Sequence, residues 1–210
     1  MTLKPVIVET RSFFNDIAQI FTPQIADKQL DLVIRIDTSL PAYIQVDDVR
    51  LRQVLINLIA NAIKFTEQGG IYVSLSWKDE LLSGHVSDSG TGIPAHSQDR
   101  IFETFQQVDN SSTRHHSGTG LGLPISQQIC RAMKGDLTLS YSDNKGSEFI
   151  FFVVALANSA EVIDPEIIPE QVNTLTITDS NILAHWLDAE FSTSQSSFRT
   201  VSRVDQAIEE

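Results

Sequence analysis

The chain has 210 residues, with 27 acidic and 15 basic side chains and a formal net charge of −12. This charge argues against nonspecific binding to nucleic acid, and no apolar run approaches the roughly 18–20 residues of a membrane-spanning helix. Cys130 is the only cysteine, which excludes an internal disulfide and favours a reducing compartment. We expect Cys130 to be a small packing residue within a helix.

The N-terminal part of the chain predicts a helix followed by two strands. Val6 to Gln29 has an aromatic and aliphatic face at helical spacing, with a kink expected at Pro23. Leu30 to Ile36 carries an apolar residue at every second position, as a half-buried strand does. A short second strand is expected over Ala42 to Val46.

Asp48 to Phe65 predicts one long helix with two unlike faces, capped by Asp47 or Asp48. One side carries the apolar residues that a core would cover. The other side carries a polar stripe at steps of three and four, formed by Arg50, Gln53, Asn57, Asn61 and Lys64. Because unpaired buried amides cost roughly 1–3 kcal/mol each, the stripe indicates either a ligand with oxygens and negative charge or a face exposed to solvent.

A predicted hairpin follows and leads into a loop that contains an acid and two glycines. Its strands are Ile71 to Trp77 and Leu81 to Val86. Asp88 then stands at the strand end, with Gly90 and Gly92 after it. Glycines in such a loop allow the backbone to approach another group closely. The same pattern occurs in plain turns, so alone it does not distinguish a site from a turn.

The next segment predicts a lid between two helices. Pro94 to Phe105 is expected to form a short helix with buried aromatic residues. Gln106 to Thr119 is polar and has no periodic apolar pattern, which is typical of a functional loop or lid. The glycines of Gly118 to Gly122 stand where the following helix begins, with Pro124 in its first turn. Free N–H groups at such a helix start can bind phosphate.

The C-terminal elements of the domain are a helix and a hairpin. Leu121 to Met133 predicts the helix, and Gly135 is expected to end it in the left-handed conformation. Asp136 to Ser142 and Glu148 to Ala155 predict the hairpin. The domain is expected to close near Ala157.

The composition of the chain changes near residue 158. Residues 1–157 hold 17 acids and 13 bases, whereas residues 158–210 hold 10 acids and 2 bases. We therefore expect one domain over residues 1–157, an acidic linker with prolines over 158–172, and a further segment over 173–210. That last segment is too short for an ordinary domain.

Four patches now stand in sequence order: Asn57…Asn61…Lys64-Phe65, Asp88-x-Gly90-x-Gly92, Phe102-x-x-Phe105 and Gly118-x-Gly120-x-Gly122. With the stretches RLRQVLINLIANAIKFT and GTGLGLPIS, they resemble the catalytic ATP-binding domain of sensor histidine kinases, whose broader class includes Hsp90, the DNA gyrase B subunit and MutL. The resemblance covers about Val6 to Ala157. It implies an α/β fold of the Bergerat type, a two-layer α/β sandwich with a mixed, mostly antiparallel sheet, helices on one side and an ATP lid.

The resemblance implies a role for each residue near the base and the metal. Asp88 would accept a hydrogen bond from the adenine amino group, and Gly90 and Gly92 would let the backbone crowd the base. Asn61 would ligate Mg²⁺ through its amide oxygen, a hard ligand that suits this ion. Asn57, one helical turn earlier, would contact the metal shell or the phosphates.

The resemblance also implies the phosphate contacts. Lys64 would supply positive charge, and Arg114 in the lid would reach the γ-phosphate. Phe102 and Phe105 would anchor the base of the lid. The glycine turn would surround the phosphates with N–H groups at a helix start, through Gly118, Thr119, Gly120, Leu121 and Gly122.

One position separates the subclasses of this broader class. The ATP-hydrolysing relatives carry a Glu four residues before the metal-binding Asn, as general base for water. Here that position is Asn57, and an amide cannot take a proton at neutral pH. The resemblance thus implies an enzyme, the ATP-binding part of a protein histidine kinase, which holds Mg-ATP for phosphoryl transfer. A nucleotide-gated interaction module without transfer and an anti-sigma-type protein serine kinase stay open as alternatives.

None of the five histidines lies in the acceptor motif of the family. The implied partners are therefore a histidine-bearing dimerisation domain of the same kinase, not present in this chain, and a downstream receiver or response regulator. No contact of this chain with nucleic acid or membrane is expected. The expected location is cytoplasmic, and an inner-membrane anchor in the parent protein is left open.

The C-terminal segment has two interpretations. Residues 173–210 resemble the first third of a receiver domain, partial and degenerate, with only Asp179 at the acidic site. A strand over Asn173 to Thr178 and a helix over Ile182 to Phe191 would open it. The alternative is a disordered or loosely docked acidic tail.

Overall fold

The computed structural model describes residues 1–105, 120–158, 174–177 and 198–201. The chain divides into two compact units, Met1–Val162 and Ile163–Glu210. In the second unit, strand β9 (Thr174–Ile177) pairs in parallel with β10 (Phe198–Val201). The strand expected over Asn173 to Thr178 is thus present, whereas the helix expected over Ile182 to Phe191 lies outside the described residues.

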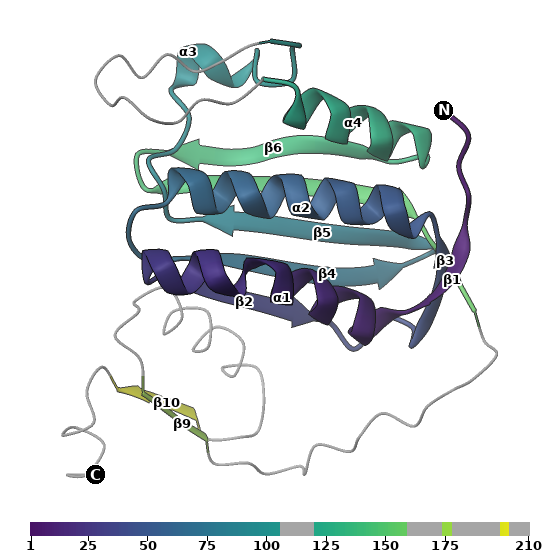
Figure 1. Ribbon diagram of the computed structural model, residues 1–210, viewed down its shortest axis with the longest axis horizontal. Helices are drawn as coiled ribbons and strands as arrows, with labels where there is room; N and C mark the ends of the chain where they lie inside the picture. Colours follow the sequence, from purple (N-terminus) through teal and green to yellow (C-terminus); the bar gives the residue numbers. More distant parts are fainter. Residues whose placement is uncertain (106–119, 159–173, 178–197, 202–210) are drawn as a thin grey trace. The chain divides into compact units, whose positions relative to one another are not determined.

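The first unit is built on a five-stranded sheet in the order β2-β4-β5-β7-β6. Its strands are β2 (Asp31–Ile36), β4 (Gly70–Lys78), β5 (Leu81–Asp88), β6 (Asp136–Asp143) and β7 (Gly146–Val154). The pair β2 and β4 is parallel, and the other pairs are antiparallel. Helices α1 (Thr10–Lys28), α2 (Asp48–Phe65) and α4 (Gly122–Ala132) lie together over one face (Figure 1). The predicted two-layer α/β fold is confirmed.

A small second sheet has the order β1-β3-β8, with β1 (Val6–Glu9), β3 (Tyr43–Val46) and β8 (Leu156–Ala157). The prediction of a helix from Val6 was wrong at its start, because the run Val6-Ile7-Val8 is β-branched and pairs with β3. Helix α1 begins only at Thr10, where the Glu9 carboxylate accepts hydrogen bonds from two first-turn N–H groups.

The segment before the lid is less helical than expected. Helix α3 covers only Ala95–Gln98, followed by turns, so the prediction of a helix over Pro94 to Phe105 was wrong for most of its length. Phe102 does pack edge-on against Phe149, with ring centroids 6.5 Å apart. Phe105 instead has positive φ and is 74% exposed, so it is not a core residue.

The end of α4 also differs from the prediction. Lys134, and not Gly135, has the left-handed φ of 59°. Gly135 is needed for another reason, since a Cβ there would lie 1.6 Å from the carbonyl oxygen of Phe152 on β7. The glycine allows the chain leaving α4 to press against the sheet.

The core lies between the sheet and the three covering helices. Its fully buried side chains come from both layers, among them Phe14, Ile17, Leu51, Leu55, Leu58, Ile59, Leu75, Leu82 and Phe151. Cys130 is fully buried, and burial raises its pKa to about 12, so it is an inert packing residue as expected. Among the described residues, no helix combines the length and apolarity that crossing a membrane requires.

Candidate functional site

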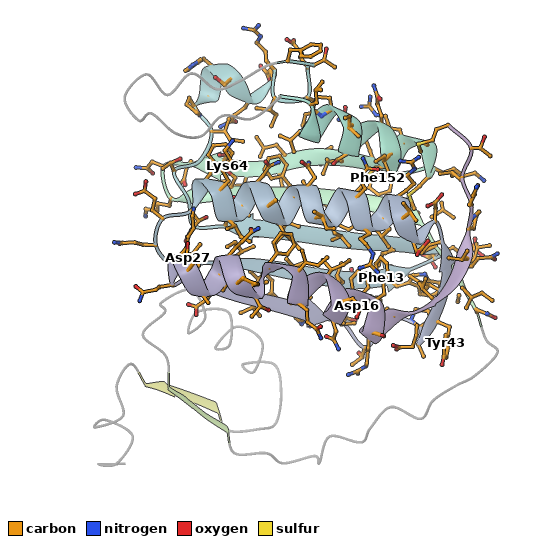
Figure 2. All side chains as sticks on the ribbon, in the orientation of Figure 1. Phe13, Asp16, Asp27, Tyr43, Lys64 and Phe152 are labelled. Carbon is orange, nitrogen blue, oxygen red and sulfur yellow. The ribbon has the colours of Figure 1, made fainter. Side chains whose placement is uncertain are left out.

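Helix α2 carries the predicted polar stripe on its side away from the core. The Asp47 carboxylate caps the helix by accepting a hydrogen bond from the Arg50 N–H at 3.0 Å. Asn57, Asn61 and Lys64 are each only partly exposed, whereas Gln53 is exposed. Lys64 lies at the carboxyl end of the helix, the end where α3 and the start of α4 also lie (Figures 1 and 2).

The start of α4 packs directly on the polar stripe of α2. The Asn57 Nδ2 donates a hydrogen bond to the Ser126 Oγ at 3.0 Å. A Cβ on Gly122 would lie 2.2 Å from the Asn57 Oδ1, so only glycine fits there without displacing the amide. The glycine turn at the start of α4 and the polar stripe of α2, which are far apart in sequence, are therefore neighbours.

Asp88 ends β5 and is partly buried. It accepts hydrogen bonds from the backbone N–H of Gly90, at 2.8 Å, and from that of Ser147. Burial raises the pKa of Asp88 to about 6, and these two hydrogen bonds only partly oppose the effect. Such a carboxylate gains from a further hydrogen-bond donor, which a ligand could supply.

The loop after Asp88 is held between α2 and the β6–β7 turn. The Thr91 N–H donates to the Phe65 carbonyl, at the end of α2, at 3.3 Å. A Cβ on Gly90 would lie 2.4 Å from that same carbonyl oxygen. Gly92 has a φ of 68°, and a Cβ there would lie 1.6 Å from the Asp143 carbonyl oxygen. The close backbone approach expected of these glycines is thus made to the protein's own carbonyl groups.

The glycine turn is described from Gly120 onward. Gly120 has a φ of 66°, and no side-chain cap satisfies the first N–H groups of α4 within the part described. The Phe105 N–H donates to the Gly120 carbonyl at 3.1 Å, so the two ends of the predicted lid meet. The candidate residues Arg114, Gly118 and Thr119 lie outside the described residues.

Two contacts around the candidate site were not predicted from the sequence. One is Ser126, which lies within the GTGLGLPIS stretch but had no assigned role. The other is Lys28 at the end of α1, whose Nζ donates to the carbonyl oxygens of Ile63 at 2.6 Å, Thr66 at 3.1 Å and Lys64 at 3.3 Å. Because α1 and the end of α2 are 35 or more residues apart, no local pattern reveals this cap.

Replacing Lys28 with methionine should lower the free energy of unfolding by about 1–2 kcal/mol, because three carbonyl groups at the end of α2 lose a charged donor. Urea unfolding followed by circular dichroism measures the change. Lys78→Met, at the exposed end of β4, is the matched control and should have a much smaller effect. Equal effects of the two substitutions would contradict the capping role.

A cavity of about 380 Å³ lies beside the loop after Asp88. It is lined by residues 91–95, Gln98 and residues 142–144 of the β6–β7 turn. Neither Asp88 nor the amide row of α2 lines it. Of the predicted site residues, only Gly92 lines it.

Comparisons with known sequences show the family of this chain. The family described as histidine kinase-, DNA gyrase B-, and HSP90-like ATPase matches residues 46–157. The signal transduction histidine-protein kinase BarA of Escherichia coli strain K12 is 35% identical over 158 residues, which are 73% of this chain and 17% of that protein. The aerobic respiration control sensor protein ArcB of the same strain is 36% identical and covers 75% of this chain. The chain spans only 17–20% of the length of these two relatives.

Solved structures show the same fold. Full-length ShkA in complex with AMPPNP matches with a TM-score of 0.82 at 25% identity, over 100% of this chain and 43% of that one. A nucleotide-free catalytic domain of the histidine kinase ThkA matches with a TM-score of 0.62 at 27% identity, over 72% of this chain and 98% of that one. The chain therefore belongs to the histidine kinase-, DNA gyrase B- and HSP90-like ATPase family, and it carries an ATP-binding catalytic domain of the histidine kinase type.

Proposed function

We propose that this chain is the Mg-ATP-binding, phosphoryl-donating part of a hybrid sensor histidine kinase. The observation that carries the proposal is that the loop after Asp88 and the start of α4 both contact helix α2, which bears the polar stripe. The end of α2 contacts the loop after Asp88, and its polar stripe contacts the start of α4. An acceptor for a base and free N–H groups for phosphates thus flank one row of amide and amine side chains.

The base end of the proposed site is the Asp88 carboxylate. Its raised pKa reflects a charge that protein groups satisfy only in part. An adenine amino group would donate to this carboxylate, whereas the carbonyl oxygen of guanine in the same place would repel it. Asp88 would therefore select adenine, and Gly90 and Gly92 allow the loop to fold tightly enough to aim it.

The phosphate end would be held by Lys64, by Arg114 and by the turn from Gly118 through Thr119, Gly120 and Leu121 to Gly122. The amide oxygen of Asn61 is the proposed ligand of Mg²⁺. The described residues hold no group of three or more His, Cys, Asp or Glu side chains that could bind a metal. A single amide ligand still fits this ion, because Mg²⁺ keeps several waters and is completed by the phosphates of the nucleotide. When bound, it would neutralise phosphate charge.

The amide of Asn57 favours phosphoryl transfer over hydrolysis of ATP. An amide cannot remove a proton from water, and here its nitrogen is engaged by Ser126. The residues of this chain would then position the γ-phosphate and stabilise its charge, as phosphoryl transfer requires. The incoming nucleophile would come from a histidine of a separate dimerisation domain.

His85 does not suit the acceptor role. His85 and Asp88 lie three positions apart on β5, so their side chains point to opposite faces of the sheet. His85 instead lies 3.5 Å from the Glu148 carboxylate. We therefore propose that the phosphoryl group passes to a histidine of a dimerisation domain and then to a receiver. We also propose a cytoplasmic location.

The C-terminal segment fits the same proposal as a partial receiver over residues 173–210, joined by the linker 158–172 to the domain 1–157. Parallel pairing of β9 with β10 supports this, because parallel neighbours need a crossover connection that is usually a helix. The helix expected over Ile182 to Phe191 would be that crossover.

Asn61→Ala should remove most of the gain in ATP affinity that Mg²⁺ provides. We expect the affinity in the presence of Mg²⁺ to fall roughly tenfold or more, because one charge-assisted contact is lost. Calorimetric titration with ADP and a non-hydrolysable ATP analogue, with and without Mg²⁺, measures it. Gln53→Ala is the control, since Gln53 shares the stripe but is exposed. An Asn61→Ala variant that keeps the full Mg²⁺ effect would contradict the metal role.

Phosphoryl transfer is tested by mixing the chain with labelled ATP and a separately prepared dimerisation domain that carries the acceptor histidine. We expect acid-labile phosphohistidine on the added domain and none on this chain alone. Nucleotide binding without any transfer would support an interaction module instead, and acid-stable phosphate on a partner would support a serine kinase.

A further inference from the structure

We propose that Ser126 is a positioning residue that, through Asn57, holds the start of α4 in place for the phosphates of the nucleotide. This inference rests on the proposed function and deepens it, because it assigns a role to a residue that would itself touch no ligand. It predicts that Ser126 affects binding at one end of the nucleotide only.

Ser126 and Gly122 lie four residues apart on α4, so they share one face of the helix. That face meets Asn57. The Asn57 Nδ2 donates to the Ser126 Oγ at 3.0 Å, and the Asn57 Oδ1 occupies the space where a Cβ of residue 122 would be. One amide thus touches both residues and fixes where α4 begins relative to α2.

The contact joins a buried serine to a partly exposed asparagine. The Ser126 residue is only 1% exposed, and no described buried side-chain nitrogen or oxygen atom lacks a hydrogen-bond partner. Removing the Ser126 hydroxyl would leave the Asn57 nitrogen without the acceptor that the buried serine supplies. The amide would then turn, and because it fills the space beside Gly122, the first turn of α4 would shift with it.

The base end of the site is held by other contacts. The loop after Asp88 is joined to α2 by the bond from the Thr91 N–H to the Phe65 carbonyl and is packed on the Asp143 carbonyl through Gly92. None of these groups touches Ser126 or Asn57 in the bonds described. Loss of the Ser126 hydroxyl should therefore weaken phosphate binding and leave adenine binding unchanged.

The experiment compares ADP with adenosine as probes on the full chain. We expect Ser126→Ala to weaken ADP binding about tenfold, the scale of one lost buried hydrogen bond, with adenosine affinity unchanged. Ser126→Thr keeps the hydroxyl and should restore ADP affinity, and Ser126→Cys, of nearly the same size, serves if the alanine variant does not fold. In an Asn57→Ala background, Ser126→Ala should have no further effect on ADP affinity, because its partner is already gone.

Three results would overturn the inference: equal loss of ADP and adenosine affinity, unchanged ADP affinity in Ser126→Ala, or a full effect of Ser126→Ala in the Asn57→Ala background. A wild-type chain that binds neither probe would instead refute the proposed function itself. The two failures are distinguishable because only the second is seen without any substitution.

Discussion

Replacing Asp88 with asparagine should weaken adenosine binding roughly 100-fold at pH 8, the scale of a lost charge-assisted hydrogen bond with a mismatched donor left in its place. The asparagine oxygen can still accept from the Gly90 N–H, as the carboxylate does at 2.8 Å. Its NH₂ group would then face the adenine amino group, and two donors repel. Guanosine, which presents a carbonyl oxygen there, should lose less affinity or gain some.

The same substitution should stabilise the ligand-free domain at neutral pH. The pKa of Asp88 is raised from its ordinary value of 3.8 to about 6, so the folded state binds a proton more tightly than the unfolded chain. The free energy of unfolding therefore falls as the pH rises from about 4 to about 6 and stays low above that window. Removing the charge should regain on the order of 2 kcal/mol at pH 7, reduced by any hydrogen bond from the Ser147 N–H that the new NH₂ group cannot accept.

Two measurements check these expectations. Urea unfolding at pH 4 and at pH 7 gives the stability change, with the exposed Asp99→Asn as control. Adenosine titration across pH 5–8 should show wild-type affinity falling below pH 6, about the pKa of Asp88, as the carboxylate becomes protonated, and little pH dependence in Asp88→Asn. An Asp88→Asn variant less stable than wild type at pH 7, or one with undiminished adenosine affinity, would contradict the assignment.

Gly92→Ala should destabilise the domain by at least about 3 kcal/mol, because two penalties act together. The residue has a φ of 68°, which costs an L-residue roughly 1–2 kcal/mol. Its new Cβ would also lie 1.6 Å from the Asp143 carbonyl oxygen, so the loop or the β6–β7 turn must move. Since that loop aims Asp88, adenosine affinity should fall as well.

The control for Gly92→Ala is Thr91→Ala, which changes an exposed neighbouring side chain in the same loop. It should leave the urea midpoint nearly unchanged, since the Thr91 contact to α2 is made by its backbone N–H. If Gly92→Ala were as stable as Thr91→Ala, the tight fit of the loop against the β6–β7 turn would be refuted.

Long periodic segments were predictable from the sequence. Asp48–Phe65 is helical over the predicted range, because its apolar spacing and the Asp47 cap act within a few residues. The hairpin β4–β5 follows the same logic, and its turn residues Asp79 and Glu80 adopt positive φ as a tight turn requires. The motif match then predicted which loops would come to this helix.

Segments governed by distant partners were not predictable in the same way. Val6–Glu9 directly precedes helix α1 but pairs with β3 in the small sheet. Gly135 looked like a helix-ending glycine, yet it is required by contact with the Phe152 carbonyl. Phe105 looked like a core aromatic, yet it is exposed at the end of the lid, where its N–H bonds to Gly120.

The sequence by itself determined the family, the layered α/β fold and the amide, aspartate and glycine patches, because these depend on residue types at short, regular spacing. Only the tertiary structure decided how the patches are held: Lys28 at the end of α2, Ser126 on Asn57, and Gly92 against Asp143. Each of those contacts joins residues 35 or more positions apart in the sequence. Contacts over such distances produce no periodic pattern of residue types from which they could be predicted.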